Sequence, residues 1–354
     1  MRRTPWLLAL AAGVLAACSS TSAVTAPTAA PPAPSVSATP TPTPTPVRTS
    51  PLTGLPAPAP GPVLVVKLDN THNAQPHAGL DRADVVYLEE VEYGITRIAA
   101  VFDSVIPDRI GPVRSARITD IDLFAQYGQP AFAFSGAQHK MLPVIADSPL
   151  IDVSPNKGAS NYQRDHSRPA PYNLFLDGVK ALALAPDASV DRDLGWTFAD
   201  AAPLGGIPTT KARMSWSEAA AAFIYDEATG DYRIRLNNRP AQAEESSAGQ
   251  RADTVVIQYV HQEPSAFFDK GGGNTPHADT IGDGTAVILR DGLAYDVTWH
   301  RPDAQSGTTF TMPDGTVFPF KPGQQWIVLL NEKTPATLTQ PQPASAPGTA
   351  SASP

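Results

Sequence analysis

Cysteine is nearly absent from this chain of 354 residues, because Cys18 is its only one. A single cysteine excludes an internal disulfide, a cluster of thiolate metal ligands and dithiol redox chemistry. The folded part of the chain must therefore be stabilised by its own hydrophobic core, and a chain of this length can bury a large one.

Basic residues are in the minority. The chain has 26 Lys and Arg against 34 Asp and Glu, which gives a formal net charge of −8 at pH 7. Removal of Arg2 and Arg3 with a signal peptide takes this charge to −10. Binding to nucleic acid needs clustered cations that neutralise phosphates, so we expect no nucleic-acid partner. Polybasic attachment to anionic lipid is disfavoured for the same reason.

A long hydrophobic run is also missing. The apolar stretch from Trp6 to Leu15 is shorter than the about 20 residues that a membrane-spanning helix needs. Arg2 and Arg3 precede it, and the sequence Leu-Ala-Ala-Cys at 15–18 follows it, which is the pattern of a lipoprotein signal and its lipobox. The alternatives are an ordinary secretory signal with a chance cysteine and a transmembrane anchor.

We therefore predict a signal peptide over 1–17 and lipidation at Cys18, with diacylglycerol and palmitate as the acyl anchor. This places the protein at the cell membrane, on its extracytoplasmic face. The first expected partner is thus the membrane, reached through the lipid on Cys18.

Low-complexity segments flank the expected folded region. Residues 18–50 consist mostly of Ser, Thr, Ala, Pro and Val, and Thr-Pro repeats fill 39–46. Such a segment favours extended polyproline II at about 3.1 Å per residue, so we predict a disordered tether. The tail at 335–354 has the same composition and is also predicted to be disordered.

The intervening chain predicts a mixed fold in two parts. Over 51–205, strand-like runs surround one helical pattern, which indicates a mixed-sheet α/β or α+β domain. The predicted strands are 63–68, 85–88, 98–102 and 130–135, and the predicted helix is 116–127 with Ser115 as its N-cap. Over 206–334 the pattern is β-rich, with a hairpin at 223–235 and Asp-Gly turns at 291 and 314.

Several motifs resemble those of one family. They are PLTGL at 51–55, ADVVYLEEVEYGITRIAAVF at 83–102, IGPVRSAR at 110–117, RDHSRPAPYNL at 164–174, DTIGDG at 279–284 and PGQQW at 322–326. In these the chain resembles the YerB-like family of bacterial lipoproteins, over roughly 51–331. The resemblance implies a two-part extracytoplasmic domain of unknown function, and it implies no reaction.

Two arginines flank the start of the predicted helix. Cations at a helix N-terminus oppose its dipole, so Arg114 and Arg117 indicate that an anion docks there, together with Ser115 and free backbone N–H groups. The alternative is that both arginines pair with internal carboxylates. The candidates for this pairing are Glu89, Glu90 and Glu92.

A second cationic cluster precedes two prolines in a predicted rigid loop. Its arginines would hold an anion, its histidine exchanges protons near neutral pH, and its Tyr and Asn hydrogen-bond polar groups. The predicted ligand-binding residues are Arg164, His166, Arg168, Tyr172 and Asn173. The alternative is a solvated loop whose arginines pack on the surface.

Other candidates have less support in the pattern. Glu90 and Glu92 share one face of a strand, as a glycosidase pair would, and as acids on a solvated face also do. The histidines near Asp69 lack a zinc-site spacing, and the glycines at 271–273 lack the Lys-Ser/Thr of a phosphate loop. We therefore expect neither metal nor cofactor. Ser135 and His139 form at most a minimal nucleophile–base pattern.

The leading hypothesis is a binding or accessory module for an anionic component of the cell envelope. Peptidoglycan stem-peptide carboxylates, a precursor pyrophosphate or a teichoic-type phosphate would suit the arginines. One alternative is a cell-wall hydrolase or transferase that uses Glu90, Glu92 or His166 for proton transfer. Another is a structural partner of an envelope protein, with the acidic surface as the contact. The sequence leaves catalysis and oligomeric state open.

Overall fold

The computed structural model describes residues 48–57 and 59–342. The signal peptide predicted over 1–17, the lipidation predicted at Cys18, and most of the predicted tether and tail lie outside these residues. Among the described residues, no helix is long and apolar enough to cross a membrane. They all belong to one compact unit of the chain.

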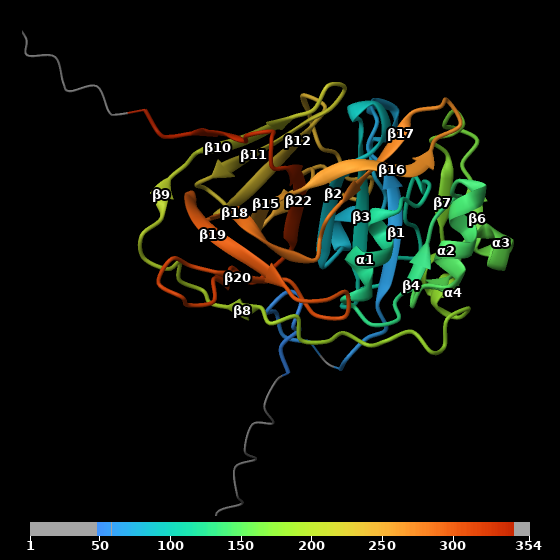
Figure 1. Cartoon of the computed structure of the whole chain (residues 1–354), viewed down its shortest axis with the longest axis horizontal. Helices are drawn as coiled ribbons and strands as arrows, with labels where there is room; N and C mark the ends of the chain where they lie inside the picture. Colours follow the sequence, from blue (N-terminus) through green and yellow to red (C-terminus); the bar gives the residue numbers. More distant parts are fainter. Residues whose placement is uncertain (1–47, 58, 343–354) are drawn as a thin grey trace, which may run out of the picture. The chain divides into compact units, whose positions relative to one another are not determined.

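One mixed sheet of 11 strands draws on both halves of the chain (Figure 1). From edge to edge its order is β20 (Thr309–Thr311), β19 (Leu293–Arg301), β18 (Gly282–Arg290), β15 (Thr254–Val260), β22 (Gln325–Asn331), β2 (Val85–Glu90), β3 (Thr96–Phe102), β1 (Leu64–Asp69), β4 (Ala131–Ala133) and β5 (Ile151–Asp152), and β9 (Ile207–Pro208) pairs with β19. β22 lies between β2 and β15. The predicted boundary at 205/206 thus separates two stretches of sequence that share one sheet.

A second sheet and three two-stranded ladders complete the β structure. The second sheet has the order β13 (Arg239–Pro240), β12 (Asp231–Leu236), β11 (Ala220–Asp226), β10 (Lys211–Ser215) and β23 (Thr337–Thr339), and β14 (Arg251–Ala252) pairs with β12. The ladders are β16 (Gln262–Phe268) with β17 (Asn274–Ala278), β8 (Thr197–Phe198) with β21 (Pro319–Phe320), and β6 (Tyr162–Arg164) with β7 (Leu174–Leu176).

Helices are short, and within the described residues none lies beyond Leu182. The α-helices are α1 (Thr119–Ala125), α2 (Leu142–Ala146), α3 (Pro155–Gly158) and α4 (Gly178–Leu182). The 3-10 turns are η1 (His72–Ala74), η2 (Leu80–Arg82), η3 (Glu92–Gly94), η4 (His139–Met141) and η5 (Ala159–Asn161). The predicted fold class, a mixed-sheet N-terminal part with a β-rich C-terminal part, is confirmed.

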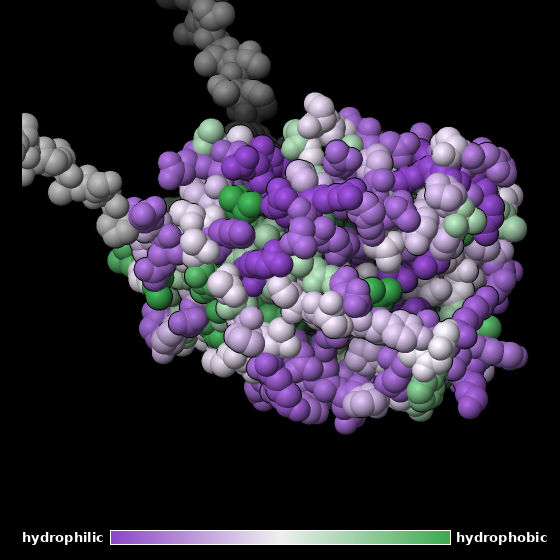
Figure 2. All heavy atoms as spheres, turned by 90° about the horizontal axis from the view of Figure 1, so that it is seen from above, coloured by the Kyte–Doolittle hydropathy of each residue, from purple (hydrophilic) through white to green (hydrophobic). Residues whose placement is uncertain are grey.

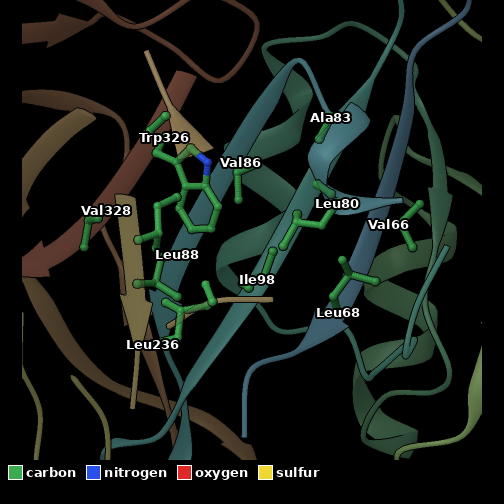
Figure 3. Packing of buried hydrophobic residues seen from close by; sticks show 14 of the residues in the cluster. Val66, Leu68, Leu80, Ala83, Val86, Leu88, Ile98, Leu236, Trp326 and Val328 are labelled. Atoms are coloured by element: carbon green, nitrogen blue, oxygen red, sulfur yellow. The ribbon is translucent and has the colours of Figure 1, made fainter. Parts of the chain in front are cut away.

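One face of the large sheet is covered by the second sheet. Side chains alternate along each strand, so Val66 and Leu68 of β1 point to the same face. They lie in one buried cluster with Val86, Trp326 and Leu236, of which Leu236 comes from β12 of the second sheet (Figure 3). Each fully buried Val or Leu contributes about 1.5–3 kcal/mol, so this interface accounts for a large part of the stability.

The opposite face changes from apolar to charged along its length. Val65 of β1 and Val101 of β3 lie in a buried cluster with Phe124 of α1. Two residues and four residues further along β1, the same face carries Lys67 and Asp69, both fully buried. The charged end of this face is where β1 terminates.

The helix predicted over 116–127 is shorter than expected. It begins at Thr119, its N-cap is Ile118 rather than Ser115, and no side chain caps it. The preceding residues instead extend between two strands, because Arg114 N donates to Lys67 O at 2.8 Å and Ser135 N donates to Arg114 O at 2.8 Å. These strand-like bonds compete with helix formation and prevail.

The structure also differs from the prediction at both low-complexity ends. Order begins before residue 51, because Ser50 is 1 % exposed and its hydroxyl accepts from Leu52 N. In the predicted tail, β23 pairs with the free edge of β10. Backbone hydrogen bonding to an open edge does not depend on hydrophobic composition, which explains this difference.

The surface seen in Figure 2 is mostly hydrophilic, and its hydrophobic residues form small separate groups. Scattered apolar residues of this kind are normal on protein surfaces. The feature that singles out one region of this molecule is therefore charge rather than exposed apolar area.

Candidate functional site

Several strands of the large sheet end side by side at one edge. β1 runs parallel to β4, β2 runs parallel to β22, and β22 runs parallel to β15. β1 and β2 share a direction because both are antiparallel to β3. We call the side of the sheet where these parallel strands reach their C-terminal ends the carboxyl edge. In open α/β sheets, ligands bind outside this edge.

The register of the central strands brings charged residues together at the carboxyl edge. Arg97 of β3 is the partner of Asp69 on β1 and of Glu89 on β2. Directly paired residues point to the same face, so the three side chains form one row. Arg97 was not among the predicted site residues, and Asp69 was weighed only as a metal ligand, since only the register reveals that the two are neighbours.

Arg114 extends this row into the gap between β1 and β4. Its Nε lies 2.5 Å from Asp69 Oδ2, and the side chain of Asp69 is fully buried whereas that of Arg114 is 23 % exposed. The guanidinium group of Arg114 makes no hydrogen bond to any residue within 48–57 and 59–342, because the contact of its Nε with Asp69 is an ion pair without hydrogen-bond geometry. Although burial raises the pKa of Asp69, Arg97 and Arg114 lower it below its ordinary value.

Arg117 is paired more completely. Its NH2 lies 2.7 Å from Glu92 Oε2, and its NH1 donates to Ala116 O at 3.0 Å. Glu92 is 2 % exposed and also accepts from Thr275 on β17. The predicted alternative of internal ion pairing therefore describes Arg117 and Arg114, with Glu92 and Asp69 as the partners.

Arg97 is the most deeply buried of the three arginines. It is 4 % exposed, and its NH1 lies 3.8 Å from Asp69 Oδ1 and donates to Thr96 O at 3.2 Å. Its Nε is buried without a partner among the described residues. Burial lowers the pKa of Arg97, and the charges of Arg114 and Arg117 add to this. Three guanidinium groups thus share two carboxylates, and we call these five residues the arginine cluster.

A buried lysine lies behind the arginine cluster. Lys67 Nζ contacts Glu89 Oε1 and lies 2.7 Å from Asp120 Oδ1, and the side chains of all three are at most 3 % exposed. Burial, together with the charge of Asp120, raises the pKa of Glu89 to about 7, although Lys67 opposes this.

When all groups are ionised, the charges of Lys67, Glu89 and Asp120 and those of the arginine cluster sum to zero. Together these residues comprise four cations and four carboxylates. Near pH 7 Glu89 holds a proton part of the time, and the whole assembly is then positive.

The second predicted cluster is a separate exposed loop. Arg164 NH1 donates to Asn173 Oδ1 at 2.8 Å, and Arg168 NH2 donates to Ala74 O at 2.9 Å. His166 is exposed, and Tyr172 is half-buried with its backbone N bonded to Pro169 O. The arginines of this loop therefore hydrogen-bond to the loop itself and to the chain at the end of η1.

His77 lies between the two predicted clusters. It is fully buried, and its Nε2 lies 2.6 Å from Asp69 O. Burial lowers the pKa of His77, and the charge of Arg168 lowers it further. The loop and the arginine cluster are therefore near neighbours of one histidine, but the contacts of Arg168 are with Ala74 and not with Asp69.

The remaining candidates do not come together as the sequence suggested. Glu92 is buried against Arg117, whereas Glu90 is half-buried and lines a surface cleft. Ser135 is held by its backbone beside Arg114, and Ser115 beside it is half-exposed. His139 is exposed at the start of η4.

Comparisons with known proteins agree with the resemblance in the motifs. Residues 52–191 match the family described as "Protein of unknown function (DUF3048) N-terminal domain", and residues 211–327 match its C-terminal domain. The Bacillus subtilis protein described as "Putative lipoprotein YerB" is 24 % identical over 309 residues, which cover 82 % of this chain and 88 % of that protein.

A solved structure extends the likeness to the fold. The crystal structure of the YerB protein from Bacillus subtilis superposes with a TM-score of 0.69 at 19 % identity, over 83 % of this chain and 100 % of that chain. The two matched segments lie on either side of the boundary predicted near 205. The chain therefore belongs to the DUF3048 family of YerB-like proteins.

Proposed function

We propose that this protein is a lipid-anchored lipoprotein on the extracytoplasmic face of the cell membrane, and that it binds an anionic group of a cell-envelope component at the arginine cluster. The lipobox pattern ending at Cys18 and the relationship to a B. subtilis protein described as a lipoprotein support the anchor. The ligand classes that suit the site are the stem-peptide carboxylates of peptidoglycan, a precursor pyrophosphate and a teichoic-type phosphate.

The observation that carries the proposal is the incomplete pairing of Arg114. Its Nε lies 2.5 Å from the buried Asp69 carboxylate without hydrogen-bond geometry, its terminal nitrogens make no hydrogen bond within the described residues, and the side chain is 23 % exposed. The guanidinium fork matches the two oxygens of a carboxylate or phosphate. Arg97 is buried next to Arg114 and adds positive charge to the site. Because it is shielded from water, its electrostatic attraction for an anion is stronger.

The chain next to the segment that carries Arg114 is open at one position. Gly136 follows β4 at φ +149°, and the space that a Cβ would occupy there has no atom within 4 Å. This opening is at the carboxyl edge, where the chain segment that carries Arg114 separates β1 from β4. Ser115 and Ser135 are half-exposed beside it and offer hydroxyl groups.

The test is calorimetric titration of the full lipidated chain in detergent. The probes are inorganic pyrophosphate, glycerol phosphate and acetyl-D-alanyl-D-alanine, at low and at physiological salt. We expect at least one probe to bind, more weakly at the higher salt. Arg114→Gln should lower that affinity by about tenfold to a hundredfold, since a charge-assisted hydrogen bond contributes about 1.5–3 kcal/mol.

Arg213→Gln, on β10 of the second sheet, is the matched control and should bind like the unaltered chain. The proposal is wrong if none of the three probes binds, or if Arg114→Gln binds them with unchanged affinity.

A further inference from the structure

A cleft of about 220 Å³ opens at the same edge of the sheet, beyond the arginine cluster. It lies where β2 and β22 end and where the hairpin of β16 and β17 begins. Its polar and aromatic lining comprises Glu90, Tyr93, Gln262, Glu263, Asn274 and Asn331. The turn η3 separates the two sites, because Glu92 pairs with Arg117 on one side while Tyr93 faces the cleft on the other.

Three of the six polar side chains in this lining, those of Tyr93, Asn274 and Asn331, make hydrogen bonds within the protein, and the other three do not. Neither Glu90 nor Glu263 makes an ion pair or a side-chain hydrogen bond with another residue of the described chain. Gln262 Nε2 is buried and also has no partner among those residues. The two carboxylates therefore remain free to bind the hydroxyl groups of a ligand, and the Gln262 amide lies buried next to them without a partner.

Tyr93 supplies an aromatic surface to this cleft. It is 54 % exposed, although its backbone adopts the left-handed conformation with φ +62° that is uncommon for residues other than glycine. The surrounding structure holds it there, because Ser217 Oγ donates to Tyr93 O at 3.1 Å and Glu218 N donates to Gly94 O at 3.2 Å. Backbone strain of this kind is concentrated at binding sites.

The loop that joins β16 to β17 fixes the ring itself. The Tyr93 hydroxyl donates to Asp269 Oδ1 at 3.2 Å. The ring also packs on Gly273, where a Cβ would come within 2.4–2.9 Å of ring atoms. Only glycine permits this approach, so the loop supports one side of the ring while more than half of the residue stays exposed.

We propose that this cleft binds one unit of a saccharide that carries no negative charge. An exposed aromatic ring packs on the C–H face of a sugar, and carboxylate and amide groups hydrogen-bond its hydroxyl groups. Because Glu90 and Glu263 line the cleft and no cation does, an acidic sugar is repelled. A sugar that carries a protonated amine is favoured for the same reason.

This inference does not rest on the anion site, which lies on the other side of η3 and has the opposite charge preference. A glycan that bears an anionic group could occupy both. The failure of one site would leave the other unaffected, since the two are measured with different probes.

The test is ligand-observed NMR on the full chain, in a detergent without a sugar headgroup and in buffer without phosphate. The probes are D-glucosamine, N-acetyl-D-glucosamine and D-glucuronate. We expect glucosamine to bind most tightly, N-acetylglucosamine next, and glucuronate at least tenfold more weakly than glucosamine.

Two variants locate the binding. Tyr93→Gly removes the ring and suits the left-handed backbone, so it should lower the affinity at least tenfold without strain. Gly273→Ala displaces the ring and should act in the same direction. Phe268→Ala is the control, because Phe268 is an exposed aromatic residue on β16 that does not line the cleft.

The proposal is overturned if none of the three sugars binds the unaltered chain. It is equally overturned if glucuronate binds as tightly as glucosamine, or if Tyr93→Gly binds as well as Phe268→Ala.

Discussion

The carboxyl edge of the large sheet has two regions that treat their carboxylates in opposite ways. In the arginine cluster, Asp69 and Glu92 are almost completely buried and each contacts a guanidinium group. In the cleft beyond η3, Glu90 and Glu263 have no such partner among the described residues. A buried charge requires a partner, whereas a carboxylate in contact with water does not. The carboxylates of the first region are therefore committed to internal ion pairs, whereas those of the second are free to bind a ligand.

The largest effect should come from removing the buried lysine. Lys67→Met leaves Glu89 and Asp120 buried next to each other without their cation. Breaking a buried pair in this way costs about 3–5 kcal/mol of folding free energy. Urea denaturation of the full chain in detergent measures it.

The matched control is Lys180→Met, because Lys180 forms an ion pair with Asp177 at 2.7 Å but its side chain is 66 % exposed. That pair should contribute far less to stability, because water screens an exposed ion pair. Equal losses in the two variants would show that burial does not distinguish these ion pairs.

A smaller loss is expected where the hairpin of β16 and β17 meets the arginine cluster. Thr275 is 2 % exposed and donates its hydroxyl to Glu92. Thr275→Val has a similar shape but leaves the carboxylate with one donor fewer, which should cost about 1.5–3 kcal/mol. Hydrogen exchange should then show faster opening of the hairpin amides.

Thr275→Ser keeps the hydroxyl group and is the control for this contact. If Thr275→Ser destabilises the protein while Thr275→Val does not, the methyl group and not the hydrogen bond holds the hairpin in place.

The pH dependence of stability tests the buried carboxylate of Glu89. Burial raises the pKa of Glu89 from 4.5 to about 7, so the folded state binds this proton more tightly than the unfolded state does. Between these two values the free energy of unfolding should fall as the pH rises, because the unfolded state releases the proton first. In Glu89→Gln this contribution is absent.

The measurement is denaturant unfolding of both proteins at pH 5 and pH 7.5. The difference in stability between Glu89→Gln and the unaltered chain should shift in favour of the variant at the higher pH. A difference that does not change with pH would mean that Glu89 is ionised throughout the window.

Local patterns predicted much of the fold. The hydrophobic runs at 63–68, 85–88 and 98–102 correspond to β1, β2 and β3. What they did not predict is the pairing of β22 with β2, which unites the two halves of the chain. That pairing joins residues far apart in the sequence, and hydrophobic periodicity carries no information about it.

The candidate site was predicted in part for the same reason. Arg114 and Arg117 were identified from their unusual position before a helix, although the helix starts later and Ser115 does not cap it. Arg97 was overlooked within a strand-like run. It becomes visible only when the register sets it opposite Asp69, and register depends on long-range pairing.

The smallest effect on stability is expected in the cleft, where a substitution should stabilise the protein instead of destabilising it. Burial raises the pKa of Glu90, and no cation among the described residues compensates for it. Above its pKa the ionised carboxylate therefore disfavours the folded state, and Glu90→Gln should stabilise the protein at pH 7. Because the side chain is half-exposed and screened by water, the gain should be about 0.5 kcal/mol. Thermal unfolding measures it, and Glu263→Gln, at an exposed position, should change the stability less.

A gain in stability on Glu90→Gln, accompanied by weaker binding of glucosamine, would identify a residue kept for a ligand at the expense of the fold. A loss of stability would mean that Glu90 is engaged within the folded chain, as Asp69 and Glu92 are. The two regions of the edge would then be alike, and the cleft would lose the free carboxylate on which its preference for an amine depends.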